Sequence, residues 1–111
     1  MASRLRGRAS RGPADALVRK IRAPTLLVQG TVDTLFTLDE AVRNYRVLRR
    51  QGVPARMVWF CGGHGACLTK EGDAEYPIAA TVRWFARYVK RKKVATGPRF
   101  VGIDQNGTHF T

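Results

Sequence analysis

The sequence is poor in cysteine and has no long apolar run. Its two cysteines, Cys61 and Cys67, are too few for the disulfide framework of a small secreted domain. A reduced, cytoplasmic setting is therefore the default expectation. No apolar stretch approaches the roughly 20 residues that a membrane-spanning helix needs, and the arginine-rich N-terminus lacks the apolar segment of a secretory signal. We accordingly expect no membrane partner.

Acidic residues are also scarce, with 8 Asp and Glu against 20 Lys and Arg and a formal net charge of +12. Residues 1–22 hold seven basic side chains and one acid, which is half of that excess. A basic excess can attract nucleic acid, but no RNP pattern, zinc-finger spacing or basic zipper follows. We interpret residues 1–20 as a solvated basic segment, and a basic module that binds nucleic acid stays an alternative.

The sequence does contain the pattern of a strand–helix–strand unit within one globular domain of 111 residues. Residues 25–29 and 55–60 are continuous apolar runs, typical of strands buried on both faces of a parallel sheet. Between them, Thr37 and Glu40 have the spacing of a capping box, and the periodicity predicts a helix over 38–51. These signals predict the α/β class, with a right-handed crossover between two parallel strands.

A second helix is predicted over 77–92, where apolar residues recur at helical spacing. Gly97 and Pro98 then interrupt the pattern. Residues 100–103 are predicted to form a further strand, and residues 104–107 a turn.

Two polar side chains with chemical potential follow the two predicted strands. Asp33 ends the loop after the first strand, and His64 lies in the glycine-rich loop after the second. The carboxyl ends of parallel strands meet at one edge of a sheet, where sites form. A carboxylate there can fix the tautomer of a neighbouring imidazole. From these residues alone, Asp33 as a turn former and His64 as a flexible surface residue remain alternatives.

Cys61, His64 and Cys67 are spaced three residues apart and could supply three zinc ligands, but no fourth ligand lies nearby. Either cysteine could also act as a nucleophile beside the histidine. We expect instead that both are small apolar filler next to the last strand, and we expect no metal and no cofactor.

Three segments, 24–33, 62–65 and 82–85, resemble the closing section of α/β-hydrolases, and more narrowly the Xaa-Pro dipeptidyl-peptidase and cocaine-esterase-like group. The resemblance implies a serine hydrolase acting on a peptide, ester or amide substrate. It assigns Asp33 as the acid of the triad and His64 as its general base. The tail over 97–107 resembles the entry into that group's C-terminal β-sandwich, or jelly roll.

One part of that pattern is missing. In α/β-hydrolases the chain order is Ser, Asp, His, with the serine in a Gly-x-Ser-x-Gly turn. The sequence has Ser3 and Ser10, and neither lies in such a turn. We therefore expect a partial α/β-hydrolase fold, the last two parallel strands with their helices, that is inactive alone and has the remainder of the hydrolase domain as its partner. A non-catalytic interaction domain remains a further alternative.

The predicted organisation has three parts: a basic segment over 1–20, the C-terminal part of an α/β-hydrolase domain over 21–95, and the truncated start of a β-sandwich domain over 96–111.

Overall fold

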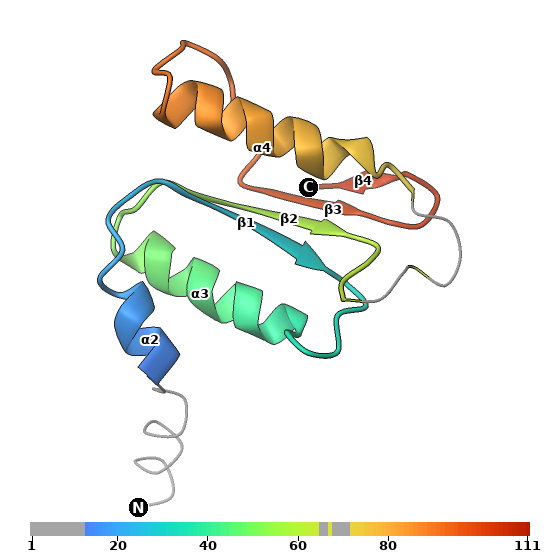
Figure 1. Cartoon of the computed structure of the whole chain (residues 1–111), viewed down its shortest axis with the longest axis horizontal. Coiled ribbons are helices and arrows are strands. Elements are labelled where there is room, and N and C mark those ends of the chain that lie inside the picture. The colour runs from blue at the N-terminus through green and yellow to red at the C-terminus, as the bar shows by residue number, and fades with distance from the viewer. Residues whose placement is uncertain (1–12, 65–66, 68–71) are drawn as a thin grey trace, which may run out of the picture.

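A computed structural model describes residues 13–64, 67 and 72–111 of the chain. Its strands form one sheet in the order β1, β2, β3, β4. The strands are β1 (Thr25–Gly30), β2 (Ala55–Phe60), β3 (Phe100–Ile103) and β4 (His109–Phe110). The first three run parallel, and β4 is antiparallel to β3 (Figure 1). The predicted α/β class is confirmed, as a mostly parallel sheet consistent with a partial α/β-hydrolase.

The two long helices lie on opposite faces of this sheet. Helix α3 (Leu38–Arg50) packs under β1 and β2, and α4 (Glu75–Tyr88) lies on the other face (Figure 1). The short helix α2 (Pro13–Val18) contacts α3. Both predicted long helices are present, although α4 begins two residues earlier and ends four residues earlier than the predicted 77–92.

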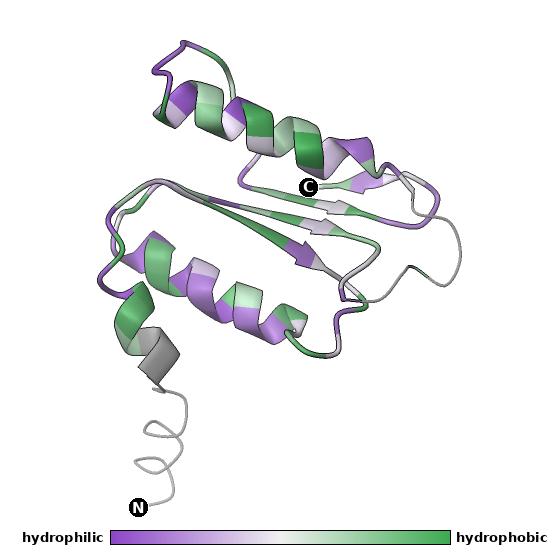
Figure 2. Cartoon of the chain, in the orientation of Figure 1, coloured by the Kyte–Doolittle hydropathy of each residue, from purple (hydrophilic) through white to green (hydrophobic). Residues whose placement is uncertain are grey.

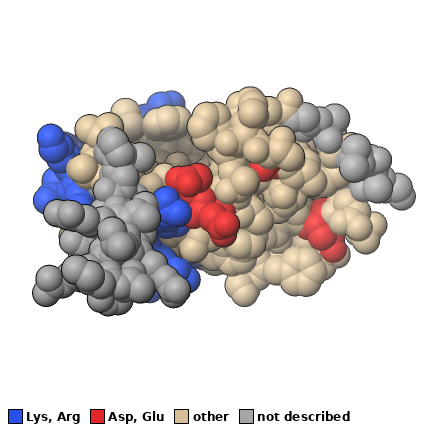
Figure 3. Space-filling view, turned by 90° about the horizontal axis from the view of Figure 1, so that it is seen from below, with Lys and Arg blue, Asp and Glu red and all other residues tan. Residues whose placement is uncertain are grey.

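Helix α3 begins at its predicted residue but not through its predicted cap. Thr37 has extended backbone angles, yet its side chain makes no capping hydrogen bond. The Glu40 amide donates instead to the Thr37 carbonyl at 3.1 Å, so the predicted capping box is wrong in its side-chain contacts. Acids in the first turn and arginines in the last suit the helix dipole. The face shown in Figure 3 carries Lys and Arg side chains towards one end and Asp and Glu side chains further along.

The core lies where α3 and α4 meet the central strands. Leu48 of α3, Val58 of β2 and Val101 of β3 are the largest fully buried side chains. Val58 and Val101 are directly paired across β2 and β3. On the face covered by α3, Leu48 forms a buried cluster with Val53 and Ala55. The apolar runs therefore serve a sheet that helices cover on both faces, as in other parallel sheets.

The tail of the chain extends this same sheet. Met57, Val58 and Trp59 of β2 pair with Phe100, Val101 and Gly102 of β3, and Gly102 pairs with Phe110 of β4. The sheet thus has two strands more than the two predicted for the hydrolase-like unit. That residues 96–111 begin a β-sandwich domain stays a prediction.

Several apolar side chains remain exposed. Four of them belong to α4 or directly follow it: Ile78, Val82, Phe85 and Val89. Figure 2 shows that much of this helix is hydrophobic. Within the described residues, no helix is long and apolar enough to span a membrane.

Candidate active site

The loops after β1 and β2 continue the parallel pairing of their strands. The Thr31 amide donates to the Phe60 carbonyl at 2.8 Å, and the Val32 amide donates to the Gly62 carbonyl at 3.1 Å. A Cβ atom added to Gly30 would lie 2.1 Å from the Gly62 oxygen, and one added to Gly63 would lie 2.7 Å from the Asp33 Cα. Glycine at these positions is what lets the two loops approach so closely.

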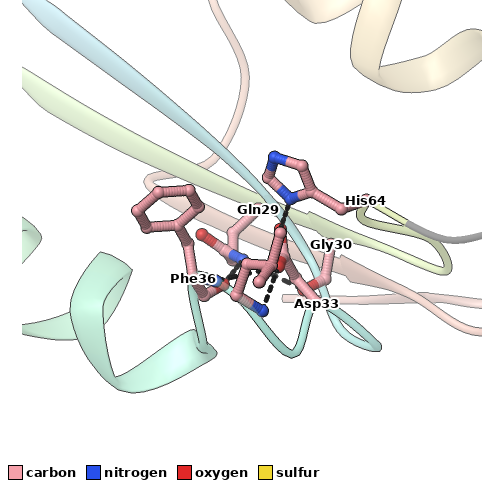
Figure 4. Close-up of polar contacts among 6 residues, drawn as sticks. Gln29, Gly30, Asp33, Phe36 and His64 are labelled. Atoms are coloured by element: carbon pink, nitrogen blue, oxygen red, sulfur yellow. Dashed lines mark hydrogen bonds and ion pairs between the residues drawn. The ribbon is translucent and has the colours of Figure 1, made fainter.

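The carboxylate of Asp33 is held by the turn that follows it. Its Oδ1 accepts hydrogen bonds from the amides of Leu35 at 3.0 Å and Phe36 at 2.9 Å. Gln29 closes the same turn, because its side-chain amide donates to the Phe36 carbonyl at 2.6 Å and the Gly30 carbonyl at 3.1 Å. Figure 4 shows these groups converging below His64. The turn therefore fixes the carboxylate with its second oxygen available.

That second oxygen meets the histidine predicted from the sequence. Asp33 Oδ2 lies 2.9 Å from Nδ1 of His64, and the expected contact between these two residues is confirmed (Figure 4). The Asp33 side chain is 7% exposed and that of His64 is 55% exposed. The ring of Phe36 lies 5.4 Å from the imidazole, tilted by 46°. One partner is thus enclosed by the loops, while the other faces solvent.

Hydrogen bonding sets the charge of the pair. The Phe36 amide lowers the pKa of Asp33 below its ordinary value; burial opposes this shift, and the hydrogen bonds from His64 and Leu35 lower the pKa further. The carboxylate is therefore ionised at neutral pH and can only accept. Nδ1 of His64 must carry the proton, which leaves Nε2 of the neutral ring with a free lone pair. This arrangement can accept a proton at Nε2 and stabilise the resulting imidazolium.

The cysteines differ from their predicted role. Cys61 and Cys67 form a disulfide with a Cα–Cα distance of 5.5 Å, so the expectation of two small apolar filler residues is wrong. Two cysteines six residues apart can form a single short cross-link. The number of cysteines was weighed only against a framework of several disulfides, so this cross-link was missed. Residues 65–66 and 68–71 lie outside the described residues.

A second histidine–aspartate pair went unnoticed in the sequence. Nε2 of His109 lies 3.0 Å from Oδ2 of Asp73, and the ring of Tyr76 contacts the imidazole edge-on at 4.7 Å. Both side chains are partly exposed, at 37% and 40%. The signal was hidden because the two residues are 36 positions apart, in a hairpin and a helix start rather than in loops that follow parallel strands.

Within the part of the chain that the structure describes, neither pair has a third chemical group that completes a catalytic or metal site. The described residues contain no cluster of three or more His, Cys, Asp or Glu side chains suited to a metal. The sequence has no serine between residues 11 and 111. The Asp33–His64 pair can therefore provide a base and its orienting acid, and the two serines of the sequence, Ser3 and Ser10, lie outside the described residues.

Comparison with known families extends the resemblance over most of the chain. The model of the prolyl oligopeptidase family matches residues 4–92. This range contains β1, α3, β2, α4 and both residues of the Asp33–His64 pair, and it stops before β3. Searches of curated proteins and of solved structures each found no match. With four fifths of its residues matched, the chain belongs to the prolyl oligopeptidase family, a family of serine peptidases.

Proposed function

We propose that the chain carries the acid and the base of a Ser-His-Asp triad, with Asp33 as the acid and His64 as the base. The observation that carries the proposal is the 2.9 Å contact from Nδ1 of His64 to Asp33. That contact leaves Nε2, the nitrogen that faces the serine in such triads, free to take a proton. Membership in a serine peptidase family supports the same roles.

In the proposed reaction, a serine supplied by another segment attacks the carbonyl carbon of a peptide. Its Oγ forms the new bond to carbon, and its proton passes to Nε2 of His64. Asp33 stabilises the imidazolium across the Nδ1 hydrogen bond. His64 then returns the proton to the leaving amine as the carbon–nitrogen bond breaks. Water then attacks the acyl carbon while Nε2 of His64 takes its proton, and the bond from carbon to the serine Oγ breaks as His64 returns the proton to that oxygen.

The substrate class follows from the family. A peptide is the substrate implied by family membership. Action on Xaa-Pro peptides, or on esters and amides as in the cocaine-esterase-like group, is a finer proposal that rests on the resemblance of the tail. The cytoplasmic location expected from the sequence likewise stays a prediction.

The proposed partner is the remainder of the hydrolase domain, and the open edge at β1 supports it. β1 is the outermost strand of the sheet among the described residues. A groove of about 520 Å³ runs beside it, lined by residues of β1, the following loop and α3. Leu35 and Phe36 in its wall are 69% and 59% exposed. An unpaired strand beside exposed apolar side chains is a surface that another strand can extend and cover.

The test compares the chain alone with a reconstituted enzyme, made by joining it to a family segment that carries a Gly-x-Ser-x-Gly turn. We expect residues 1–111 alone to hydrolyse neither p-nitrophenyl esters nor Xaa-Pro anilides above buffer. The reconstituted enzyme should hydrolyse at least one of them and lose that activity on His64→Ala, while His109→Ala serves as the matched control. Turnover by the chain alone that His64→Ala abolishes would mean that the nucleophile lies within the chain.

A further inference from the structure

The Cys61–Cys67 disulfide encloses the residue that the proposed function makes the base. Cys61 directly follows β2, so the sheet fixes one end of the bond. Cys67 lies six residues on, and His64 is the midpoint, three residues from each cysteine. The bond therefore closes a short ring of chain around His64.

Among the described residues, few other contacts hold this histidine. The pairing between the two loops reaches Gly62, whose carbonyl accepts from Val32. Beyond Gly62, no backbone hydrogen bond holds Gly63 or His64 to another described residue. The imidazole itself is 55% exposed and has one polar partner among the described residues, Asp33. The sheet thus anchors the start of this loop, and the disulfide is a covalent anchor on the far side of His64.

We propose that the Cys61–Cys67 disulfide is the positioning element of His64, and that cleaving it releases the imidazole from Asp33. The proposal rests on the proposed function, in which this contact orients the base. A closed ring limits the conformations of the residues inside it, and opening the ring restores them. A single hydrogen bond to a half-exposed side chain gains little net free energy, so this added freedom favours separation of the pair.

The opening step is a two-electron reduction. A dithiol such as dithiothreitol attacks one sulfur as a thiolate, and the Cys61–Cys67 bond breaks. Its second thiolate then displaces the remaining cysteine from the mixed disulfide. The protein gains two electrons and two protons as two thiols, and the reagent becomes a cyclic disulfide. No other co-reactant is needed.

The two histidines make the test specific, because their hydrogen bonds select opposite tautomers. His64 bonds to Asp33 through Nδ1, whereas His109 bonds to Asp73 through Nε2. The chain has no other histidine. Nitrogen-15 NMR of the full chain at neutral pH therefore reports the Nδ1–H form at His64 and the Nε2–H form at His109. Intact-mass analysis after thiol alkylation reports the state of the cysteines in the same samples.

We expect the oxidised chain to show the Nδ1–H form at His64, and reduction to abolish it while the His109 signal is unchanged. A double variant, Cys61→Ser with Cys67→Ser, should resemble the reduced chain and show no response to dithiothreitol. Persistence of the His64 form in the reduced chain and in the double variant would overturn the proposal and leave the acid–base pair intact. So would free thiols in the air-oxidised chain.

Two other outcomes are informative. Loss of both histidine patterns on reduction would mean that the disulfide holds the fold as a whole, which overturns a specific positioning role. Absence of the Nδ1–H form from the oxidised chain would contradict the Asp33–His64 pair itself, and with it both the proposed function and the proposal. The failure of the positioning role is thus separate from that of the proposed function.

Discussion

The molecule contains two histidine–aspartate pairs with nearly equal distances, 2.9 Å for His64–Asp33 and 3.0 Å for His109–Asp73. In both, one carboxylate oxygen accepts from backbone amides, two at Asp33 and one at Asp73, and the other meets the imidazole. The two pairs differ in their surroundings. Asp33 lies in the loop after β1, which is hydrogen-bonded to the loop after β2, and its side chain is 7% exposed. Asp73 lies just before α4, and its side chain is 40% exposed.

The difference shows that a histidine–aspartate contact alone does not identify a site. Asp33 holds Nδ1 of His64 and leaves Nε2, at the outer end of the ring, open to a substrate or a serine. Asp73 bonds to Nε2 of His109, so the nitrogen at the outer end of that ring is already engaged. The other nitrogen, Nδ1, lies next to the backbone. The same chemical groups therefore form the proposed base in one region and a contact between a hairpin and a helix in the other.

The largest expected effect separates the two pairs by activity. In the reconstituted enzyme, Asp33→Asn should lower kcat by about 10⁴-fold, because an amide cannot hold the required tautomer or stabilise the imidazolium. Asp73→Asn, the matched substitution in the other pair, should change kcat less than twofold. Steady-state kinetics on the anilide substrate measure both. Equal losses in the two variants would contradict the assignment of the pairs.

A second prediction concerns the glycine beside each aspartate. A Cβ on Gly63 would lie 2.7 Å from the Asp33 Cα, whereas a Cβ on Gly107 would have Asp73 backbone nitrogen as a nearest neighbour at 3.8 Å. Both glycines have positive φ, at 154° and 81°. Gly107→Ala should thus cost about 1–2 kcal/mol of backbone strain, and Gly63→Ala about 2–5 kcal/mol because it adds a steric clash.

Urea unfolding of the two alanine variants measures these costs, and nitrogen-15 NMR shows whether each pair survives. Gly63→Ala should abolish the Nδ1–H form of His64 and spare His109. If Gly107→Ala were the more destabilising of the two, the close approach of the loops would not be what constrains the first pair.

Much of the first region could be predicted from the sequence because its signals are local. The apolar runs predicted β1 and β2, and the glycines predicted the loops that follow them. Because β1 and β2 are parallel, the loops at their carboxyl ends lie side by side. Asp33 and His64 could therefore be paired before their distance was known. The prolyl oligopeptidase match covers this region and not the tail.

The second region could not be predicted, because its contacts depend on how distant segments pack. Phe100–Ile103 was recognised as a strand, but nothing in its residues specified that it would pair with β2. The two-residue strand β4 is too short to have a periodic pattern. Without that pairing, His109 had no predicted neighbour. The Cys61–Cys67 bond was missed for a different reason, since cysteine number indicates frameworks and not single cross-links.

A third prediction follows from the lowered pKa of Asp33. Its pKa in the folded chain lies below the ordinary carboxyl value of about 3.9, so its ionised form stabilises the fold. This contribution is complete above that ordinary value and is lost as the pH falls through the lowered pKa. The urea midpoint of the wild type should therefore fall more steeply than that of Asp33→Asn as the pH is lowered from 5 to 2. Parallel curves would show that the carboxylate of the first pair is not stabilised by folding.

The smallest expected effect is in the second pair. Oδ1 of Asp73 accepts from the Tyr76 amide at 3.2 Å and so caps the first turn of α4, while Oδ2 contacts the imidazole of His109. Loss of a helix cap costs about 1 kcal/mol, and an exposed ion pair adds at most about as much again. Asp73→Ala should thus lower the free energy of unfolding in urea by about 1–2 kcal/mol.

Asp73→Asn separates the two contributions, because asparagine caps a helix about as well as aspartate but carries no charge. It should cost well under 1 kcal/mol, the share of the His109 contact, and leave the Tyr76 hydrogen bond in place. If Asp73→Asn were as destabilising as Asp73→Ala, the imidazole contact rather than the cap would account for the stability that Asp73 contributes. The second pair would then resemble the first in depending on its charge, and the contrast between the two regions would rest on their position in the sheet alone.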